Sequence, residues 1–70
     1  MNLDAYNACI RHFGLKPTPY GSKTTTVFID ATGQVYTVPK GELLTDEQRL
    51  ATIRDFAAVH GFDLPSNLLN

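Results

Sequence analysis

The sequence has little cysteine and no long apolar run, and each scarcity excludes a class of protein. It contains one cysteine, Cys9, which excludes an internal disulfide framework and fits a reducing compartment. It has no apolar run long enough to cross a membrane, and it does not begin with the pattern of a secretory signal. We therefore expect a soluble, cytoplasmic protein that makes no contact with a membrane.

Charged residues are also scarce, and they are unevenly distributed. They make up 19% of the chain and give a formal net charge of −1. Residues 5–29 hold three basic side chains and no acidic one: Arg11, Lys16 and Lys23. Because affinity for a phosphate backbone depends on the number of charges that the protein neutralises, three are too few to predict nucleic-acid binding by themselves.

The length of the chain leaves little margin of stability. Its 70 residues suffice for one domain, residues 1–70, and 43% of them are hydrophobic, which is typical of a folded globular protein. At this size the burial of apolar surface barely offsets the conformational entropy that folding costs. Dimerisation or a bound protein partner would supply the shortfall.

Residues 24–38 predict a β-hairpin. The first half, TTTVFI, is rich in the β-branched and aromatic residues that suit a strand, and QVYTV follows after a turn sequence. Asp30 can hydrogen-bond to the turn backbone, and Gly33 can adopt the positive φ of a three-residue loop. This register places Ile29 opposite Val35, Phe28 opposite Tyr36 and Val27 opposite Thr37.

Both faces of this hairpin are apolar. One face carries Phe28, Tyr36 and Val38, and the other carries Val27, Ile29 and Val35. A sheet with one face in water normally alternates apolar and polar residues. Either both faces are covered within the chain, for example by Leu64, Leu68 and Leu69, or one face is reserved for a partner.

A helical pattern lies on each side of the hairpin. The first helix, capped by Asn2 or Asp4, is expected to end near Phe13, before Gly14. The second is expected over residues 46–60, with Thr45-Asp46-Glu47-Gln48 as its capping box. Residues 16–22 contain two prolines and should be extended, as a short edge strand. The fold class is therefore α+β, with two helices packed on a hairpin or a small three-stranded antiparallel sheet, in the order α-(β)-β-β-α.

The residue types that carry chemistry do not form a catalytic pattern. His12 and His60 each lie near the end of a predicted helix, where capping or packing explains them, and no metal-ligand spacing occurs. Cys9 lies on the apolar stripe of the first helix and is interpreted as a buried, inert thiol. We expect no enzymatic activity, no catalytic residues, no metal or cofactor and no small-molecule substrate.

Several short segments resemble the HicA/YcfA-like family. They are His12-Phe13-Gly14-Leu15, Gly21-Ser22, Val27-Phe28, Gly33, Thr37-Val38-Pro39 and the stretch from Thr52-Ile53-Arg54 to Gly61-Phe62. Members of that family are small toxins that cleave messenger RNA and have the α-β-β-β-α fold of double-stranded-RNA-binding domains.

The resemblance implies a fold and an orientation more than an activity. The family's catalytic histidine falls on Lys23 or Thr25, and neither side chain can replace it as an acid–base near neutral pH. The family's orientation would place Phe28, Tyr36 and Val38 under the helices. Val27, Ile29 and Val35 would then face outward, as an apolar strip of the kind that marks association sites.

Two hypotheses for function follow. In the first, the chain is a non-enzymatic interaction module, such as an inhibitor or adaptor of phage or another mobile element. It binds a protein partner, or a second copy of itself, through Val27, Ile29 and Val35 or through an unpaired strand edge. In the second, it is a HicA-like RNA-binding protein or degenerate nuclease that uses Lys16, Tyr20 and Lys23.

Overall fold

A computed structural model describes residues 1–68, which form two α-helices and a three-stranded antiparallel sheet. The elements in chain order are α1 (Leu3–His12), β1 (Lys16–Gly21), β2 (Thr25–Ile29), β3 (Val35–Pro39), the 3-10 turn η1 (Gly41–Leu43), α2 (Asp46–His60) and the 3-10 turn η2 (Ser66–Leu68). The predicted α+β class is confirmed, and residues 16–21 do form a third strand.

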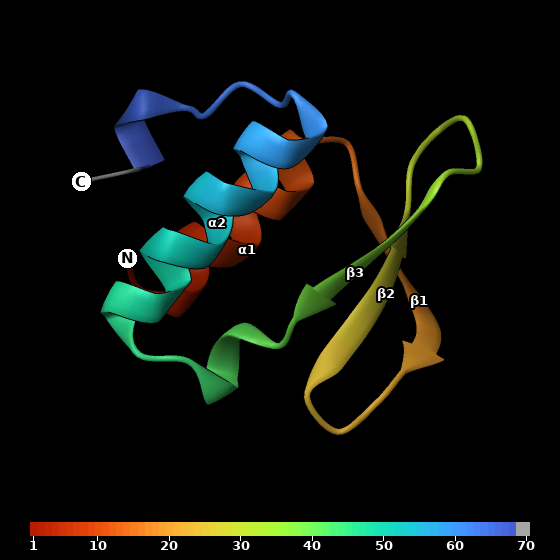
Figure 1. Cartoon of the computed structure of the whole chain (residues 1–70), viewed down its shortest axis with the longest axis horizontal. Helices are drawn as coiled ribbons and strands as arrows, with labels where there is room; N and C mark the ends of the chain where they lie inside the picture. The colour runs from red at the N-terminus through yellow and green to blue at the C-terminus, as the bar shows by residue number, and fades with distance from the viewer. Residues whose placement is uncertain (69–70) are drawn as a thin grey trace.

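The helices and the sheet form two layers. Helices α1 and α2 lie side by side and cover one face of the sheet (Figure 1). The strand order is β1-β2-β3, so β2 is central and the sheet has two free edges. We call the face under the helices the inner face and the opposite one the outer face.

Local sequence signals define both helices. The Asn2 side chain accepts a hydrogen bond from the Ala5 N–H and caps α1, whereas Asp4 lies in the first turn. Thr45 and Gln48 form the predicted capping box at the start of α2. Gly61 ends α2 in the left-handed conformation, with φ 71°. No helix in residues 1–68 has the length and apolar character that a membrane span requires.

The hairpin has the predicted register. Val27 pairs with Thr37, Phe28 with Tyr36, and Ile29 with Val35. The Asp30 N–H donates to the Gln34 carbonyl at 3.0 Å, and Gly33 has φ 91°, which closes the three-residue loop.

The core lies between the helices and the inner face. Its fully enclosed side chains include Tyr6 and Cys9 from α1, Ile53 from α2 and Val38 from β3. The Tyr6 hydroxyl donates to the Pro39 carbonyl at 2.6 Å and ties α1 to the end of β3. This packing settles which face is buried, because Val38 is 1% exposed.

Residues 63–68 pack against the helices and not on the outer face of the sheet. Leu64 and Leu68 are half-buried against the core, and η2 contacts α1. In Figure 1 this segment lies beyond the helices, on the side away from the strands. Leu64 and Leu68 therefore do not cover the outer face, and Leu69 lies outside the described residues.

Candidate interaction surface

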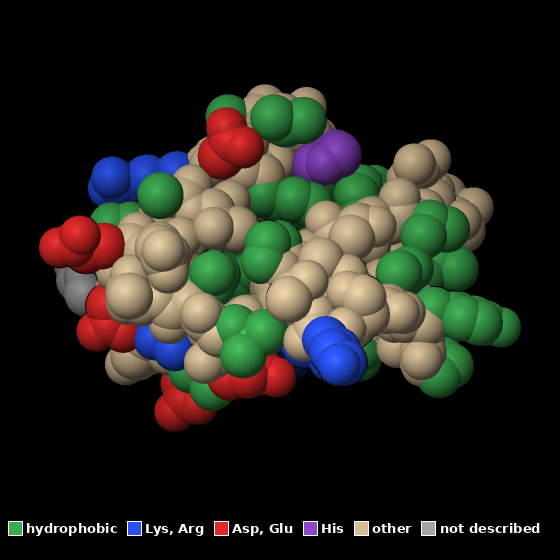
Figure 2. Space-filling view, turned by 60° about the horizontal axis from the view of Figure 1, so that its bottom comes forward, with side chains coloured by type: hydrophobic (Ala, Val, Ile, Leu, Met, Phe, Trp, Pro, Cys, Tyr) green, Lys and Arg blue, Asp and Glu red, His purple; other side chains and the backbone are tan. Residues whose placement is uncertain are grey.

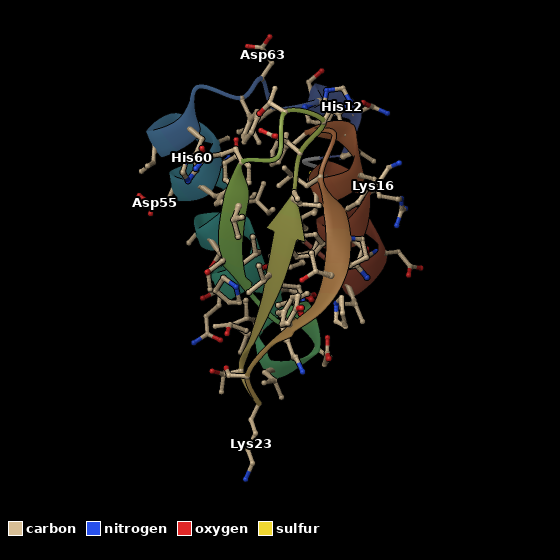
Figure 3. All side chains as sticks on the ribbon, turned by 90° about the vertical axis from the view of Figure 1, so that its right-hand side faces the viewer. His12, Lys16, Lys23, Asp55, His60 and Asp63 are labelled. Atoms are coloured by element: carbon tan, nitrogen blue, oxygen red, sulfur yellow. The ribbon has the colours of Figure 1, made fainter. Side chains whose placement is uncertain are left out.

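The outer face of the sheet carries an uncovered apolar strip. Because paired residues share a face, Ile29 and Val35 lie side by side there. Val27 lies on the same face, two positions before Ile29 on β2. Val35 is 55% exposed and Ile29 is 36% exposed, while Val27 is half-buried. Figure 3 looks onto this face, and both helices lie behind the sheet. We call Val27, Ile29 and Val35 the outer strip.

The inner-face residues of the hairpin are used within the chain. Phe28 and Tyr36 pack against the buried core, and Val38 belongs to it. The aromatic ring of Tyr36 also meets the rings of Phe56 and His60, with its centroid 5.0 Å from that of His60. The two apolar faces of the hairpin therefore differ: the inner one is packed against the core, whereas Ile29 and Val35 on the outer one are exposed, with Lys16 and Thr37 as cross-strand neighbours of Ile29 and Val27.

The free edge of β1 is poorly suited to pairing with another strand. Pro17 and Pro19 have no N–H group, so the edge lacks a donor at both positions. Its pairing with β2 is also irregular, because the register shifts between Pro17 and Gly21. Prolines and bulges of this kind are the usual means by which proteins prevent a sheet edge from adding strands.

The free edge of β3 is open. The Asp30 N–H donates to Gln34 and the Lys40 N–H donates to Thr24, one bond at each end of the β2–β3 ladder. Residues of an antiparallel ladder alternate between bonding their partner strand and pointing away from it. With the observed register, the backbone groups of Val35 and Thr37 therefore point away from β2, toward the free edge.

A groove separates this edge from α2. It has a volume of about 340 Å³, and Thr37 and Pro39 line it on the strand side. On the helix side it is lined by Asp55, Phe56, Val59 and His60. Val59 is 70% exposed, which is high for a branched apolar side chain in a helix. The groove and the outer strip meet at β3.

The three residues of the RNA-binding hypothesis do not form one patch. Lys16 begins β1, and Lys23 lies in the loop beyond its other end. Figure 3 shows the two lysine side chains at opposite ends of the sheet. Tyr20 lies between them and is 74% exposed. In Figure 2 the acidic side chains gather over the helical half of the molecule, and the sheet half has few charges of either sign.

The titratable groups with altered pKa values have structural explanations. Burial raises the pKa of the Cys9 thiol, which is 0% exposed, as predicted for a buried thiol. Burial also raises the pKa of Tyr6 to about 12. His60 packs among aromatic rings, and His12 meets Phe13 edge to face with centroids 6.3 Å apart. Both histidines are exposed and lie beside aromatic rings.

No three His, Cys, Asp or Glu side chains in residues 1–68 come together as metal ligands would. Ser22 forms hydrogen bonds with Thr24 and Thr25 inside its own loop, so its hydroxyl has a structural role. The chemistry that this surface offers is apolar contact and backbone hydrogen bonding.

Sequence reasoning missed the groove beside β3. The groove depends on how α2 lies relative to a strand edge, and no local pattern reports that geometry. One signal was present: Val59 lies outside the apolar stripe of α2 predicted from Leu50, Ile53, Phe56 or Ala57, and His60. A single exposed apolar residue is common on protein surfaces, so this signal alone does not predict a groove.

Comparison of the chain with models of known protein families, with curated proteins and with solved structures finds no match.

Proposed function

We propose that this chain is a small, non-enzymatic interaction module that binds a protein partner through the outer face of its sheet. The observation that carries the proposal is the outer strip, where Ile29 and Val35 lie side by side in solvent beside Val27. Exposed apolar side chains that adjoin one another on a small domain are typical of association surfaces. The partner covers the strip and stabilises a chain that has a small core.

A pull-down with matched variants tests this function. The bait is the wild-type chain, Val35→Asp or Leu43→Asp, exposed to a bacterial lysate with and without RNase. Leu43 is 57% exposed and lies in η1, outside the strip, so it controls for the loss of an apolar side chain. We expect a stoichiometric protein that survives RNase and is retained by wild type and Leu43→Asp. Val35→Asp should retain roughly tenfold less, because a carboxylate would be desolvated in the interface.

Two outcomes contradict the proposal. Equal retention by Val35→Asp and wild type would remove the outer strip from the interface. The second outcome is that the bait retains RNA, which disappears on RNase treatment. If the double variant Lys16→Glu with Lys23→Glu no longer retains this RNA but Val35→Asp does, the RNA-binding hypothesis is favoured instead. Circular dichroism of each variant shows whether it is folded.

A further inference from the structure

The free edge of β3 offers a specific set of backbone groups. The N–H and C=O groups of Val35 and Thr37 point away from β2, and within residues 1–68 the side-chain hydrogen bond to them is a long one, from the Gln34 amide to the Val35 carbonyl at 3.4 Å. The two residues are two positions apart, about 7 Å along the strand. An extended polypeptide repeats its donors and acceptors at the same spacing, so it satisfies both residues at once.

The chain itself cannot fill this position with its described elements. Strand β1 is paired with β2 on the far side of the sheet, and η2 lies against α1. A second copy could not add its β1 edge in the same way, because Pro17 and Pro19 provide no donors there. The position is therefore open to a strand of another chain, either a peptide segment of a partner or the β3 edge of a second copy, and the last comparison below distinguishes the two.

The groove specifies the side chains of that strand. Side chains alternate along a strand, so every second residue of an added strand would enter the groove between β3 and α2. There they would contact Phe56, which is half-buried, and Val59, which is 70% exposed. The intervening residues would lie on the outer face beside Val35. Apolar residues suit both positions.

The charge of the groove sets a further requirement for the sequence of the added strand. Asp55 lines the groove on the helix side, and no lysine or arginine lines it. In residues 1–68 the ion pair that forms is between Arg49 and Asp46, so Asp55 has none. Figure 3 shows the Asp55 and His60 side chains on the flank of the molecule where α2 extends past the sheet. A basic residue on the added strand would complement this rim.

We propose that the free edge of β3 binds an extended peptide segment of the partner as a fourth strand, with apolar side chains in the groove against α2 and a basic residue facing Asp55. The inference rests on the proposed function, because it states how the protein partner is engaged. It assigns a recognition role to the Thr37 backbone and to Val59.

The first test uses a peptide selected on the wild-type chain from a displayed library of random twelve-residue sequences. The synthetic peptide is titrated against wild type, Thr37→Pro and Thr37→Val. Proline removes the N–H that faces the free edge, and the same strand already holds a proline two positions on, Pro39. We expect roughly tenfold weaker binding by Thr37→Pro and a change within about twofold for Thr37→Val, which keeps the N–H.

Two measurements keep the test informative if Thr37→Pro does not fold. Hydrogen exchange should show that the amides of Val35 and Thr37 exchange rapidly in the free chain and become protected when the peptide binds. N-methylation of alternate peptide residues should abolish binding in one register and spare it in the other, because only every second N–H faces β3. Failure to select any peptide, or protection of other amides, overturns the proposal.

The last comparison separates this inference from the proposed function. Ile29→Asp changes the outer face in the central strand, whereas Thr37→Pro changes the edge. If the captured protein is lost with Ile29→Asp and retained with Thr37→Pro, the outer face binds and the strand addition is wrong. If the wild-type chain sediments as a dimer and Thr37→Pro as a monomer, a second copy occupies the edge and the proposed peptide partner is wrong.

Discussion

At the scale of single residues, Asp30 organises the hairpin turn. Its carboxylate accepts hydrogen bonds from the Thr32 hydroxyl at 2.6 Å, the Thr32 N–H at 2.8 Å and the Gln34 N–H at 3.0 Å. The Tyr36 hydroxyl donates to its other oxygen at 2.8 Å. These bonds, the Thr32 hydroxyl first and Tyr36 next, lower the pKa of Asp30 to about 2. The turn therefore depends on the ionised side chain.

This arrangement predicts a pH dependence of stability. The pKa of Asp30 is about 2 in the folded chain, below the ordinary value of 3.8, so the ionised carboxylate stabilises the fold above about pH 4. The contribution is lost as the pH falls toward about 2. We expect Asp30→Asn to be less stable than wild type near neutral pH, and the difference to shrink in acid. Urea unfolding of both proteins near neutral pH and near pH 2 measures the difference in their free energies of unfolding. A difference that does not change with pH would contradict the prediction.

At the scale of elements, β1 is the irregular one. Its register with β2 shifts between Pro17 and Gly21, and Gly21 has φ 141°. A Cβ atom at Gly21 would collide with the carbonyl oxygen of Thr25. Gly14, which follows α1, has φ 79° but nothing within 4 Å of the position of a Cβ atom. An alanine at Gly14 would therefore incur only the cost of the positive φ, whereas an alanine at Gly21 would incur that cost and a steric clash.

The second prediction compares alanine at these two positions. Gly14→Ala should lower the free energy of unfolding by about 1–2 kcal/mol, the cost of a left-handed conformation for a residue with a Cβ atom. Gly21→Ala should lower it further, because the start of β2, which carries the Thr25 carbonyl, must also move away from the added atom. Urea unfolding of both variants measures the difference. Equal losses would mean that the start of β2 adjusts to the added atom without cost.

At the scale of the whole molecule, the chain covers its helices better than its sheet. The C-terminal segment adds Leu64 and Leu68 to the core from the helical side. The outer face has no such cover among residues 1–68, and the β3 edge opens onto the groove. The surface that we assign to partner binding therefore lies on the sheet side of the molecule, away from both described ends of the chain.

The third prediction tests this division of roles. Leu64→Ala and Leu68→Ala should each lower the free energy of unfolding by about 1–2 kcal/mol, below the range for fully buried leucines because both are half-buried. Val35→Ala should change it by less than about 0.5 kcal/mol, because Val35 is a surface residue with no cover. Thermal or urea unfolding measures all three. A large loss with Val35→Ala would mean that the outer strip stabilises the free chain.

The sequence by itself determined the two helices and the β2–β3 hairpin, and it left open whether residues 16–21 form a third strand. The cap at Thr45, the loop closed by Gly33 and the helix end at Gly61 depend on contacts within a few residues, so their patterns were readable. The sequence offered Asn2 or Asp4 as the cap of α1, and the structure has Asn2. The hairpin register followed from matching apolar residues across that loop.

Only the tertiary structure decided which surfaces are free. Both hairpin faces are comparably apolar, so the choice of inner face depended on where α1 and α2 pack. The bond between Tyr6 and Pro39 and the contact of Tyr36 with Phe56 join residues far apart in the chain. The outer strip, the open edge of β3 and the groove follow from that long-range packing, which local sequence patterns do not encode.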